Sequence, residues 1–195
     1  MRRAAFLDRD GVINIDAGYV WRVEDFEFVP GTLDACRELA RRGWLLVVVT
    51  NQSGIGRGLY AERDFQTLTE WMRARFDECG APLAGVYHCP HHPTEAVGEL
   101  RIRCDCRKPR PGMLLAAARE LSLDLASSVM FGDTCEDLEA AHSAGISQRV
   151  LLSKDGLAPL LSDCAPGLAT AHFSSLREAV ASAQLAPVLG EAIDA

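Results

Sequence analysis

The sequence has no apolar run that approaches the roughly 18 residues of a membrane-spanning helix. Its start reaches Asp8 after four apolar residues, whereas the apolar region of a secretory signal takes about 7–15. It also lacks an excess of basic residues, since the net charge is -7 and the pI near 5.2, which argues against a general nucleic-acid binder. Internal repeats and low-complexity linkers are absent as well. We therefore expect a cytoplasmic protein with no membrane or nucleic-acid partner and, because no exposed apolar stripe is evident, a monomer.

The length of 195 residues fits one domain with a core of ordinary size. We expect this domain over 1–186, followed by a weakly patterned, frayed tail over 187–195. The seven cysteines are an odd number, and three of them gather around His91. In a reducing compartment, this pattern favours a bound metal over disulfides.

Apolar runs that are typical of buried parallel strands alternate with amphipathic stretches that indicate helices. This alternation predicts an α/β protein, a Rossmann-like three-layer α/β/α sandwich with a mostly parallel central sheet. Residues 12–21 mix β-branched, aromatic and turn residues, which suggests a flap or short hairpin. The expected strands are 4–7, 44–49, 85–88, 129–133, 149–152 and 171–173, and the expected helices are 32–42, 61–79, 113–121, one from 136–137 to Gly145, and one capped at 174–175.

Polar side chains follow several of the expected strands, where parallel sheets form their ligand crevice. Asp-x-Asp alone is weak support for a site, because it also occurs in ordinary turns. Here it is joined by other groups suited to an anion and a metal. Asp137 either caps the following helix or orients a metal shell, and both readings stay open. The polar set is Asp8 and Asp10 before Gly11, Thr50, Lys108, and Asp133 with Asp137.

In its order and residue types, this set resembles the four motifs of the haloacid dehalogenase-like (HAD) phosphatases. The resemblance implies a cap-less HAD-like fold in which Asp8 attacks phosphorus and becomes an aspartyl-phosphate. Asp10 would protonate the leaving oxygen and later activate water, with a nearby carboxylate helping it to hold its proton. Lys108 and Thr50 would hold the phosphate oxygens. The catalytic Mg²⁺ is assigned to Asp8, the backbone carbonyl of Asp10, and Asp133.

A loop over 89–106 carries a second metal pattern, Cys-x-His followed after twelve residues by Cys-x-Cys. Three thiolates and one imidazole close a tetrahedral zinc site with no open position, so we expect a structural Zn²⁺. Cys89, Cys104 and Cys106 are the thiolates, while His91 and His92 both remain possible as the fourth ligand. The metal would fix this loop beside Arg107 and Lys108. Loss of the metal would therefore displace the residues that are expected to bind the phosphate.

Segments 8–14, 16–20, 50–54 and 104–109 closely resemble the D-glycero-D-manno-heptose 1,7-bisphosphate 7-phosphatase family, in the zinc-loop branch related to histidinol phosphatases. The resemblance covers about residues 4–152. It implies Mg²⁺-dependent removal of the 7-phosphate of a small phosphorylated sugar, for the heptose precursors of bacterial surface polysaccharides such as lipopolysaccharide. It also favours His91 as the zinc ligand. It implies a catalytic role for Arg107, which would bind the second phosphate of the substrate. The implied substrate contacts are Asp16, Ala17, Gly18, Tyr19, Thr50, Asn51, Gln52, Ser53, Arg107, Lys108 and Thr134.

Two positions depart from the family pattern, in which Thr often stands in place of Val12 and Lys in place of Thr134. The second departure bears on substrate contact and hence on the sugar or its anomer. The nearest alternative is a histidinol-phosphate phosphatase of the same branch. The segment 18–20 favours the heptose enzyme over this alternative, because we associate that segment with the heptose branch. An alternative from another class is a phospho-accepting signalling receiver domain, which needs neither Asp10 as an acid nor a zinc loop. A third is an inactive zinc-stabilised binding module, which the complete set of acids disfavours.

Overall fold

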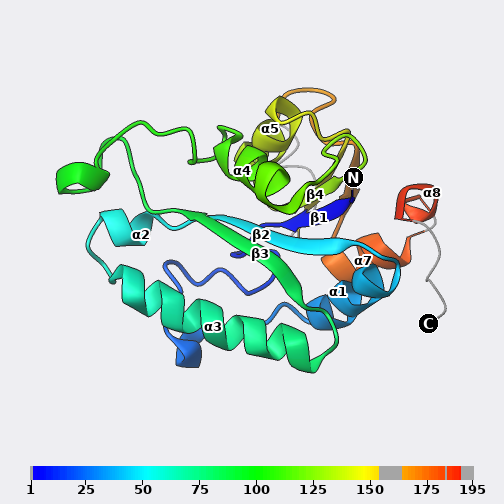
Figure 1. Cartoon of the computed structure of the whole chain (residues 1–195), viewed down its shortest axis with the longest axis horizontal. Coiled ribbons are helices and arrows are strands. Elements are labelled where there is room, and N and C mark those ends of the chain that lie inside the picture. The colour runs from blue at the N-terminus through cyan, green and yellow to red at the C-terminus, as the bar shows by residue number, and fades with distance from the viewer. Residues whose placement is uncertain (1, 154–163, 183, 190–195) are drawn as a thin grey trace.

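The computed structural model describes residues 2–153, 164–182 and 184–189, in which six strands form one parallel sheet (Figure 1). The strand order is β3-β2-β1-β4-β5-β6, and every neighbouring pair is parallel. The predicted strands are therefore confirmed, with small shifts at their ends. Their bounds are β1 Ala4–Leu7, β2 Leu45–Asn51, β3 Leu83–Cys89, β4 Val129–Gly132, β5 Gln148–Leu152 and β6 Ala171–Phe173.

Helices cover both faces of this sheet, which confirms the three-layer sandwich. Figure 1 shows α1, α3 and α7 on one face and α4 and α5 on the other. The chain begins each of these helices near the predicted residue, and α5 has a side-chain N-cap at Thr134. The helices are α1 Thr32–Arg41, α2 Ser53–Gly56, α3 Glu62–Glu78, α4 Gly112–Leu121, α5 Cys135–Ser143, α7 Leu176–Ala181 and α8 Ala186–Leu189, and the 3-10 turns are η1 Val23–Asp25 and η2 Gly98–Leu100.

The central strand β1 shows why the strands are apolar throughout. Successive side chains of a strand point to opposite faces, and both faces are covered here. Ala5 and Leu7 join the core beneath α1 and α3, whereas Ala4 and Phe6 join the core beneath α4 and α5. All four side chains are fully buried. The carboxyl end of this strand is therefore held rigidly at the centre of the sheet.

The register of β1 brings the predicted motifs to one edge of the sheet. Leu7 lies opposite Val48 of β2 and Phe131 of β4. Asp8 follows directly, and its backbone N–H donates to the carbonyl of Phe131 at 3.0 Å. Because β1, β2 and β4 are parallel and end at the same edge of the sheet, the residues at the ends of β2 and β4 lie around Asp8.

Two predictions about local structure need correction. Residues 12–21 form no paired strands, so the expected hairpin is wrong, and the segment is instead tied by single bridges such as Asn14 with Phe28. The preference for a metal over disulfides is wrong for one pair, because Cys135 and Cys164 are disulfide-bonded. Cys164 lies far from Cys135 in sequence, and only the packing of Leu138 and Leu151 around it brings the two together.

The expected tail boundary at 186 falls at the start of α8. Leu189 of this helix is fully buried in the core beneath α1. Its carbonyl accepts a hydrogen bond of 2.8 Å from the indole N–H of Trp44. Packing therefore continues to Leu189, and the rest of the expected tail, 190–195, lies outside the described residues. In the described part of the chain, no helix is both long and apolar enough to cross a membrane.

Candidate active site

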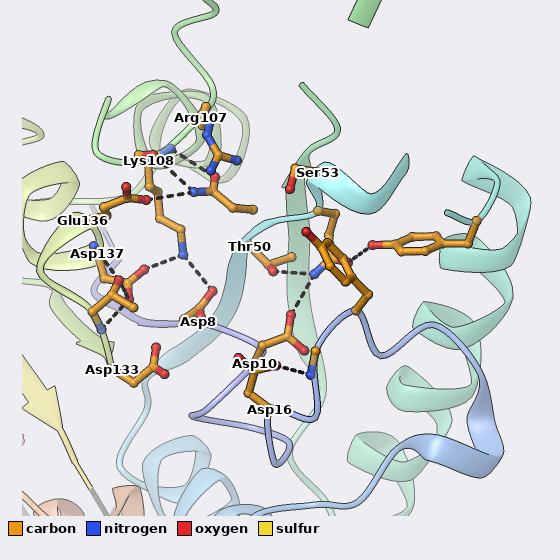
Figure 2. A pocket seen from close by; sticks show the side chains of 16 residues that line it. Asp8, Asp10, Asp16, Thr50, Ser53, Arg107, Lys108, Asp133, Glu136 and Asp137 are labelled. Atoms are coloured by element: carbon orange, nitrogen blue, oxygen red, sulfur yellow. Dashed lines mark hydrogen bonds and ion pairs between the residues drawn. The ribbon is translucent and has the colours of Figure 1, made fainter. Parts of the chain in front are cut away.

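A cavity of about 390 Å³ lies where β1, β2 and β4 end, and it collects the predicted site residues (Figure 2). All four of the predicted motifs contribute to its walls. Among the described residues, Ala17 is the predicted substrate contact that the lining leaves out. The cavity is lined by Asp8, Asp10, Asp16, Gly18, Tyr19, Thr50, Asn51, Gln52, Ser53, Tyr60, Arg107, Lys108, Asp133, Thr134, Glu136 and Asp137.

The ammonium of Lys108 joins two carboxylates at the floor of this cavity. Its Nζ donates to Asp8 Oδ1 at 2.7 Å, to Asp137 Oδ1 at 2.5 Å and to the carbonyl of Val49 at 2.9 Å. Burial by itself lowers the pKa of Lys108, but the charges of Asp137 and Asp8 outweigh it and raise the pKa. The lysine is therefore a fixed positive charge beside the nucleophile position.

Asp133 follows β4 and has the environment of a metal ligand. Its Oδ1 is buried without a hydrogen-bond partner among the described residues. A Cβ at position 11 would lie 2.0 Å from its Oδ2, so that only glycine lets the chain pass so close. Oxygen atoms of Asp8, Asp133 and Asp137 lie within 4.8 Å of one another. This cluster fits a hard divalent cation such as Mg²⁺, which takes carboxylate oxygens and leaves no buried oxygen unpaired.

The same cluster shifts the acidity of two of its members. Burial, reinforced by the charges of Asp137 and Asp10, raises the pKa of Asp8 to about 7, although Lys108 opposes the rise. Burial, with Asp8 and Asp137 adding to it, raises the pKa of Asp133 to about 8. Without a cation, these groups repel one another and hold protons at neutral pH.

Asp137 caps α5, as one of its two readings expected, and it also pairs with Lys108. Its Oδ2 accepts hydrogen bonds from the backbone N–H of Thr134 at 3.1 Å and from the Thr134 hydroxyl at 2.7 Å, which completes the capping box of α5. Its Oδ1 pairs with Lys108. The cap thus fixes the carboxylate that orients the lysine.

Asp10 is held by groups that donate hydrogen bonds. Its Oδ1 accepts from Arg9 Nη2 at 2.8 Å and from Asn14 Nδ2 at 3.0 Å, and its Oδ2 accepts from Gln52 Nε2 at 3.0 Å. We expected a second carboxylate beside Asp10 to help it hold a proton. The three hydrogen-bond partners found among the described residues each present an N–H to its carboxyl group and so fix its orientation.

Two predicted substrate contacts, Asn51 and Gln52, bond to residues that were predicted to be catalytic. The amide of Gln52 donates to Thr50 Oγ1 at 2.8 Å and accepts from the Tyr60 hydroxyl at 2.7 Å. Asn51 accepts from the backbone N–H of Lys108 at 3.1 Å and donates to its carbonyl at 3.2 Å. Asn51 therefore pairs with the Lys108 backbone as a neighbouring strand would, and links the end of β2 to the residue after the cysteine loop.

A tight turn over residues 16–19 forms one rim of the cavity. Asp16 Oδ1 accepts the backbone N–H of Gly18 at 2.9 Å. Gly18 and Tyr19 both have positive φ angles, 78° and 52°, which is uncommon for a residue with a side chain. The Tyr19 ring is 45 % exposed and lies 5.6 Å from the guanidinium of Arg57. The strained turn thus presents an aromatic face to whatever enters the cavity.

The four predicted zinc ligands converge beyond the end of β3. The Sγ atoms of Cys89, Cys104 and Cys106 lie 3.1–3.5 Å apart without a disulfide between them. His91 Nδ1 lies 3.3 Å from the sulfur of Cys106, whereas His92 Nδ1 accepts the backbone N–H of Glu95 at 3.0 Å. The donor set, three thiols and one imidazole, fits a tetrahedral Zn²⁺.

Four residues of the site were not identified from the sequence. Arg9 and Asn14 contact Asp10, Tyr60 contacts Gln52, and Glu136 lines the cavity beside Asn51. An arginine between two acids at a buried strand end is a signal that could have identified Arg9. The other three carry no local signal, because their roles depend on where the chain returns in space.

Known proteins resemble this chain over most of its length. A family model described as HAD-hydrolase-like matches residues 105–163. The D-glycero-beta-D-manno-heptose-1,7-bisphosphate 7-phosphatase of Escherichia coli K12 is 54 % identical over 149 residues, which cover 76 % of this chain and 78 % of that protein. The enzyme of the same name from Vibrio cholerae is 46 % identical over 175 residues, covering 90 % and 92 %.

Solved structures agree with these relatives. A D,D-heptose 1,7-bisphosphate phosphatase from B. bronchiseptica, complexed with magnesium and phosphate, superposes with a TM-score of 0.80 at 30 % identity, covering 91 % of this chain and 96 % of that one. A protein of Mesorhizobium loti described as a HAD-like phosphatase gives a TM-score of 0.82 at 34 % identity, covering 99 % and 88 %. The chain therefore belongs to the D-glycero-beta-D-manno-heptose-1,7-bisphosphate 7-phosphatase family of HAD-like hydrolases.

Proposed function

We propose that this protein hydrolyses the 7-phosphate of D-glycero-β-D-manno-heptose 1,7-bisphosphate, releasing heptose 1-phosphate and inorganic phosphate. The observation that carries the proposal is the group formed by Asp8, Lys108, Asp133 and Asp137 at the carboxyl ends of β1 and β4, in a chain 54 % identical to an enzyme of that name. The β-anomer is taken from the names of the relatives. The product would serve the synthesis of bacterial surface polysaccharides.

In the first half-reaction, a carboxylate oxygen of Asp8 attacks phosphorus while the bond from phosphorus to the sugar oxygen breaks. Asp10 gives its proton to that leaving oxygen, since a sugar alkoxide is a poor leaving group. Lys108 and the hydroxyl of Thr50 hold the equatorial phosphate oxygens. The hydroxyl proton of Thr50 is free to do so, because its oxygen already accepts from Gln52.

In the second half-reaction, Asp10 takes a proton from water, which attacks phosphorus and breaks the bond to Asp8. Phosphate leaves and the nucleophile is restored. The hydrogen bonds from Arg9, Asn14 and Gln52 suit this step, because they orient the carboxyl group of Asp10. The proton taken from water leaves Asp10 protonated for the next cycle.

Mg²⁺ would be held by Asp8, the backbone carbonyl of Asp10, and Asp133, and would supply positive charge against the phosphoryl oxygens. The unpaired Oδ1 of Asp133 and the mutual approach of the carboxylates support this assignment. Zn²⁺ would be held by Cys89, His91, Cys104 and Cys106 and would fix the loop that ends at Arg107 and Lys108.

The sugar and its second phosphate would contact the rim of the cavity. Arg107 lines the cavity, and its Nη1 lies 3.5 Å from the carbonyl of His91 in the zinc loop. A guanidinium there suits a phosphate. Thr134 and Ser53 also line the cavity and offer hydroxyls for the sugar.

The test is phosphate release from both anomers of heptose 1,7-bisphosphate, beside histidinol phosphate and fructose 1,6-bisphosphate, with Mg²⁺ and then with EDTA. We expect the β-anomer to be hydrolysed much faster than the other substrates, and we expect this activity to be lost when EDTA is added. A preference for histidinol phosphate would contradict the substrate assignment. A stable aspartyl-phosphate without turnover would instead indicate a phospho-accepting receiver.

Two further expectations are part of the proposal: that the enzyme is a monomer and that it acts in the cytoplasm. Light scattering of the purified protein at several concentrations tests the first. Fractionation of cells that express it from its own gene tests the second.

A further inference from the structure

Arg9 is a buried cation that contacts none of the reacting atoms in the two half-reactions. It is 1 % exposed and is the largest of the fully buried side chains. Its Nε and Nη2 donate to Asp10 Oδ1 at 3.2 and 2.8 Å, and Nη2 also lies 3.0 Å from Asp10 Oδ2. A charge so deeply buried is destabilising unless it is paired. Its pairing with Asp10 therefore requires an explanation in terms of structure or function.

The guanidinium also reaches beyond Asp10. Nη2 donates to the carbonyl of Val20 at 2.7 Å. Val20 follows the turn at 16–19, whose Gly18 and Tyr19 line the cavity. One planar group thus connects the catalytic carboxylate to the segment that forms the rim.

The backbone of Arg9 holds the loop that carries Asp10. Its carbonyl accepts the N–H groups of Ile13 at 2.8 Å and Asn14 at 3.1 Å. Asn14 in turn donates to Asp10 Oδ1 from its side chain. The side chain of Asp10 is 24 % exposed at the cavity, so that without these donors it would be free to change rotamer.

We propose that Arg9 is a positioning residue, which fixes the carboxyl of Asp10 in its acid/base position by joining it to the Val20 carbonyl behind the rim of the cavity. The inference rests on the proposed function, because it takes the acid/base role of Asp10 from there. Arg9 itself touches neither the substrate nor the reacting atoms. Nη2 donates to both Asp10 and the Val20 carbonyl, and Nε adds a second, coplanar donor to Asp10 that a lysine ammonium does not offer.

The proposal makes the two half-reactions distinguishable. A sugar alkoxide needs the proton of Asp10 to leave, whereas the leaving group of 4-nitrophenyl phosphate departs as a stable phenolate without it. Hydrolysis of the aspartyl-phosphate needs Asp10 as a base with either substrate. Displacing Asp10 therefore slows both steps with the sugar but only the second step with the aryl phosphate, and the aspartyl-phosphate accumulates.

The experiment compares Arg9→Met and Arg9→Lys with the wild type, with Asp10→Asn as the reference for a lost acid/base group. Arg37→Met is the matched control, because Arg37 is exposed on α1 and pairs with Asp34 on the same helix. The kcat for heptose 1,7-bisphosphate should fall roughly 10²-fold in Arg9→Met, within the range for general acid–base catalysis, with a much smaller change in KM. The loss in Arg9→Lys should be smaller, and Arg37→Met should match the wild type.

Stopped-flow assays with 4-nitrophenyl phosphate give the deciding readout. We expect Arg9→Met and Asp10→Asn to release about one nitrophenolate per active site in a burst that is larger, relative to the steady rate, than in the wild type. A folded Arg9→Met that keeps full kcat, or loses rate on both substrates without a burst, would overturn the proposal. If Arg9→Met does not fold, the same criteria apply to Arg9→Lys.

A failure of the proposed function would give a different experimental result from a failure of the role proposed for Arg9. If the wild type does not hydrolyse heptose 1,7-bisphosphate, the substrate assignment falls whatever Arg9 does. If the wild type turns over and Asp10→Asn shows the burst while neither Arg9 variant does, only the role of Arg9 is excluded.

Discussion

At the scale of single residues, the site is a set of opposite charges held at short distance in a buried place. Lys108 lies between Asp8 and Asp137, while Asp133 has a buried oxygen without a partner among the described residues. Under the proposed function, a cation that neutralises this cluster would remove the repulsion and leave Asp8 ionised for attack. Metal binding would then be coupled to the activation of the nucleophile.

Asp8→Asn should abolish phosphate release while leaving the fold intact. An amide of the same shape keeps the packing at the end of β1 but cannot form the aspartyl-phosphate, so we expect a loss of at least about 10³-fold in kcat. The thermal midpoint should change little, since the neutral amide relieves repulsion within the cluster. Phosphate release and calorimetry check this, with the exposed Asp34→Asn on α1 as a control that keeps full activity. Retained turnover in Asp8→Asn would exclude Asp8 as the nucleophile.

At the scale of elements, two devices hold the segment after the cysteine loop against β2. One is the cluster formed by Cys89, His91, Cys104 and Cys106. The other is Asn51, whose amide pairs with both backbone groups of Lys108. Both act on Lys108 without touching its side chain.

Replacing Cys104 with Ala should lower zinc content, stability and catalytic efficiency together. A structural zinc site contributes its binding free energy to folding, so removing one ligand weakens both. Metal analysis, thermal unfolding and kcat/KM are the measurements. Cys36→Ala is a suitable comparison, because Cys36 lies on the buried face of α1, away from the cluster, and its replacement should change stability alone. Full zinc content in Cys104→Ala would remove Cys104 from the ligand set.

Asn51→Asp should reduce kcat/KM roughly 10- to 100-fold. This corresponds to a loss of a few kcal/mol of transition-state stabilisation when the Lys108 backbone is no longer held in place. The carboxylate keeps the acceptor for the Lys108 N–H but sets a negative oxygen against the Lys108 carbonyl. Asn51→Leu should have a similar effect, because it loses both bonds. Zinc content should stay unchanged in both variants, which separates this effect from damage to the loop. Wild-type kinetics in both would show that the paired amide is dispensable.

At the scale of the whole molecule, the acidic cluster links stability to pH and to Mg²⁺. Burial raises the pKa of Asp8 to about 7 and that of Asp133 to about 8, from the ordinary value of 3.8. At pH values between the ordinary pKa and these raised pKa values, the folded, metal-free protein binds more protons than the unfolded chain. Its stability should therefore fall as the pH rises from about 4 to about 8.

Mg²⁺ should reverse this trend, because it competes with protons for the same carboxylates. We expect the rise in thermal midpoint caused by about 10 mM Mg²⁺ to be small at pH 5.5 and to reach several degrees at pH 8.5. Calorimetry with and without Mg²⁺ at both pH values measures it, and Asp133→Asn should lose most of the dependence. An equal Mg²⁺ shift at both pH values would contradict the linkage.

Most of the fold was predictable because its signals are local. Apolar runs bounded by glycines and acids predicted the strands within a few residues, and helical spacing predicted α1, α3 and α4. The hairpin alternative for 12–21 was wrong because the β-branched Ile13 and Val20 pack into the core, while strand pairing is limited to single bridges such as that of Asn14 with Phe28. The disulfide was missed because Cys135 and Cys164 meet only through packing of Leu138 and Leu151.

The sequence by itself determined which chemical groups follow each strand: carboxylates after β1 and β4, a hydroxyl at the end of β2, and a lysine behind a loop of metal-ligand spacing. Those groups are read from residue identity and order, so no coordinates are needed for them. Only the tertiary structure decided their partners. Gln52 bonds to Asp10, Asn51 bonds to the Lys108 backbone, and Arg9 joins Asp10 to Val20. Such contacts depend on strand register and on where distant segments return, which no local pattern records.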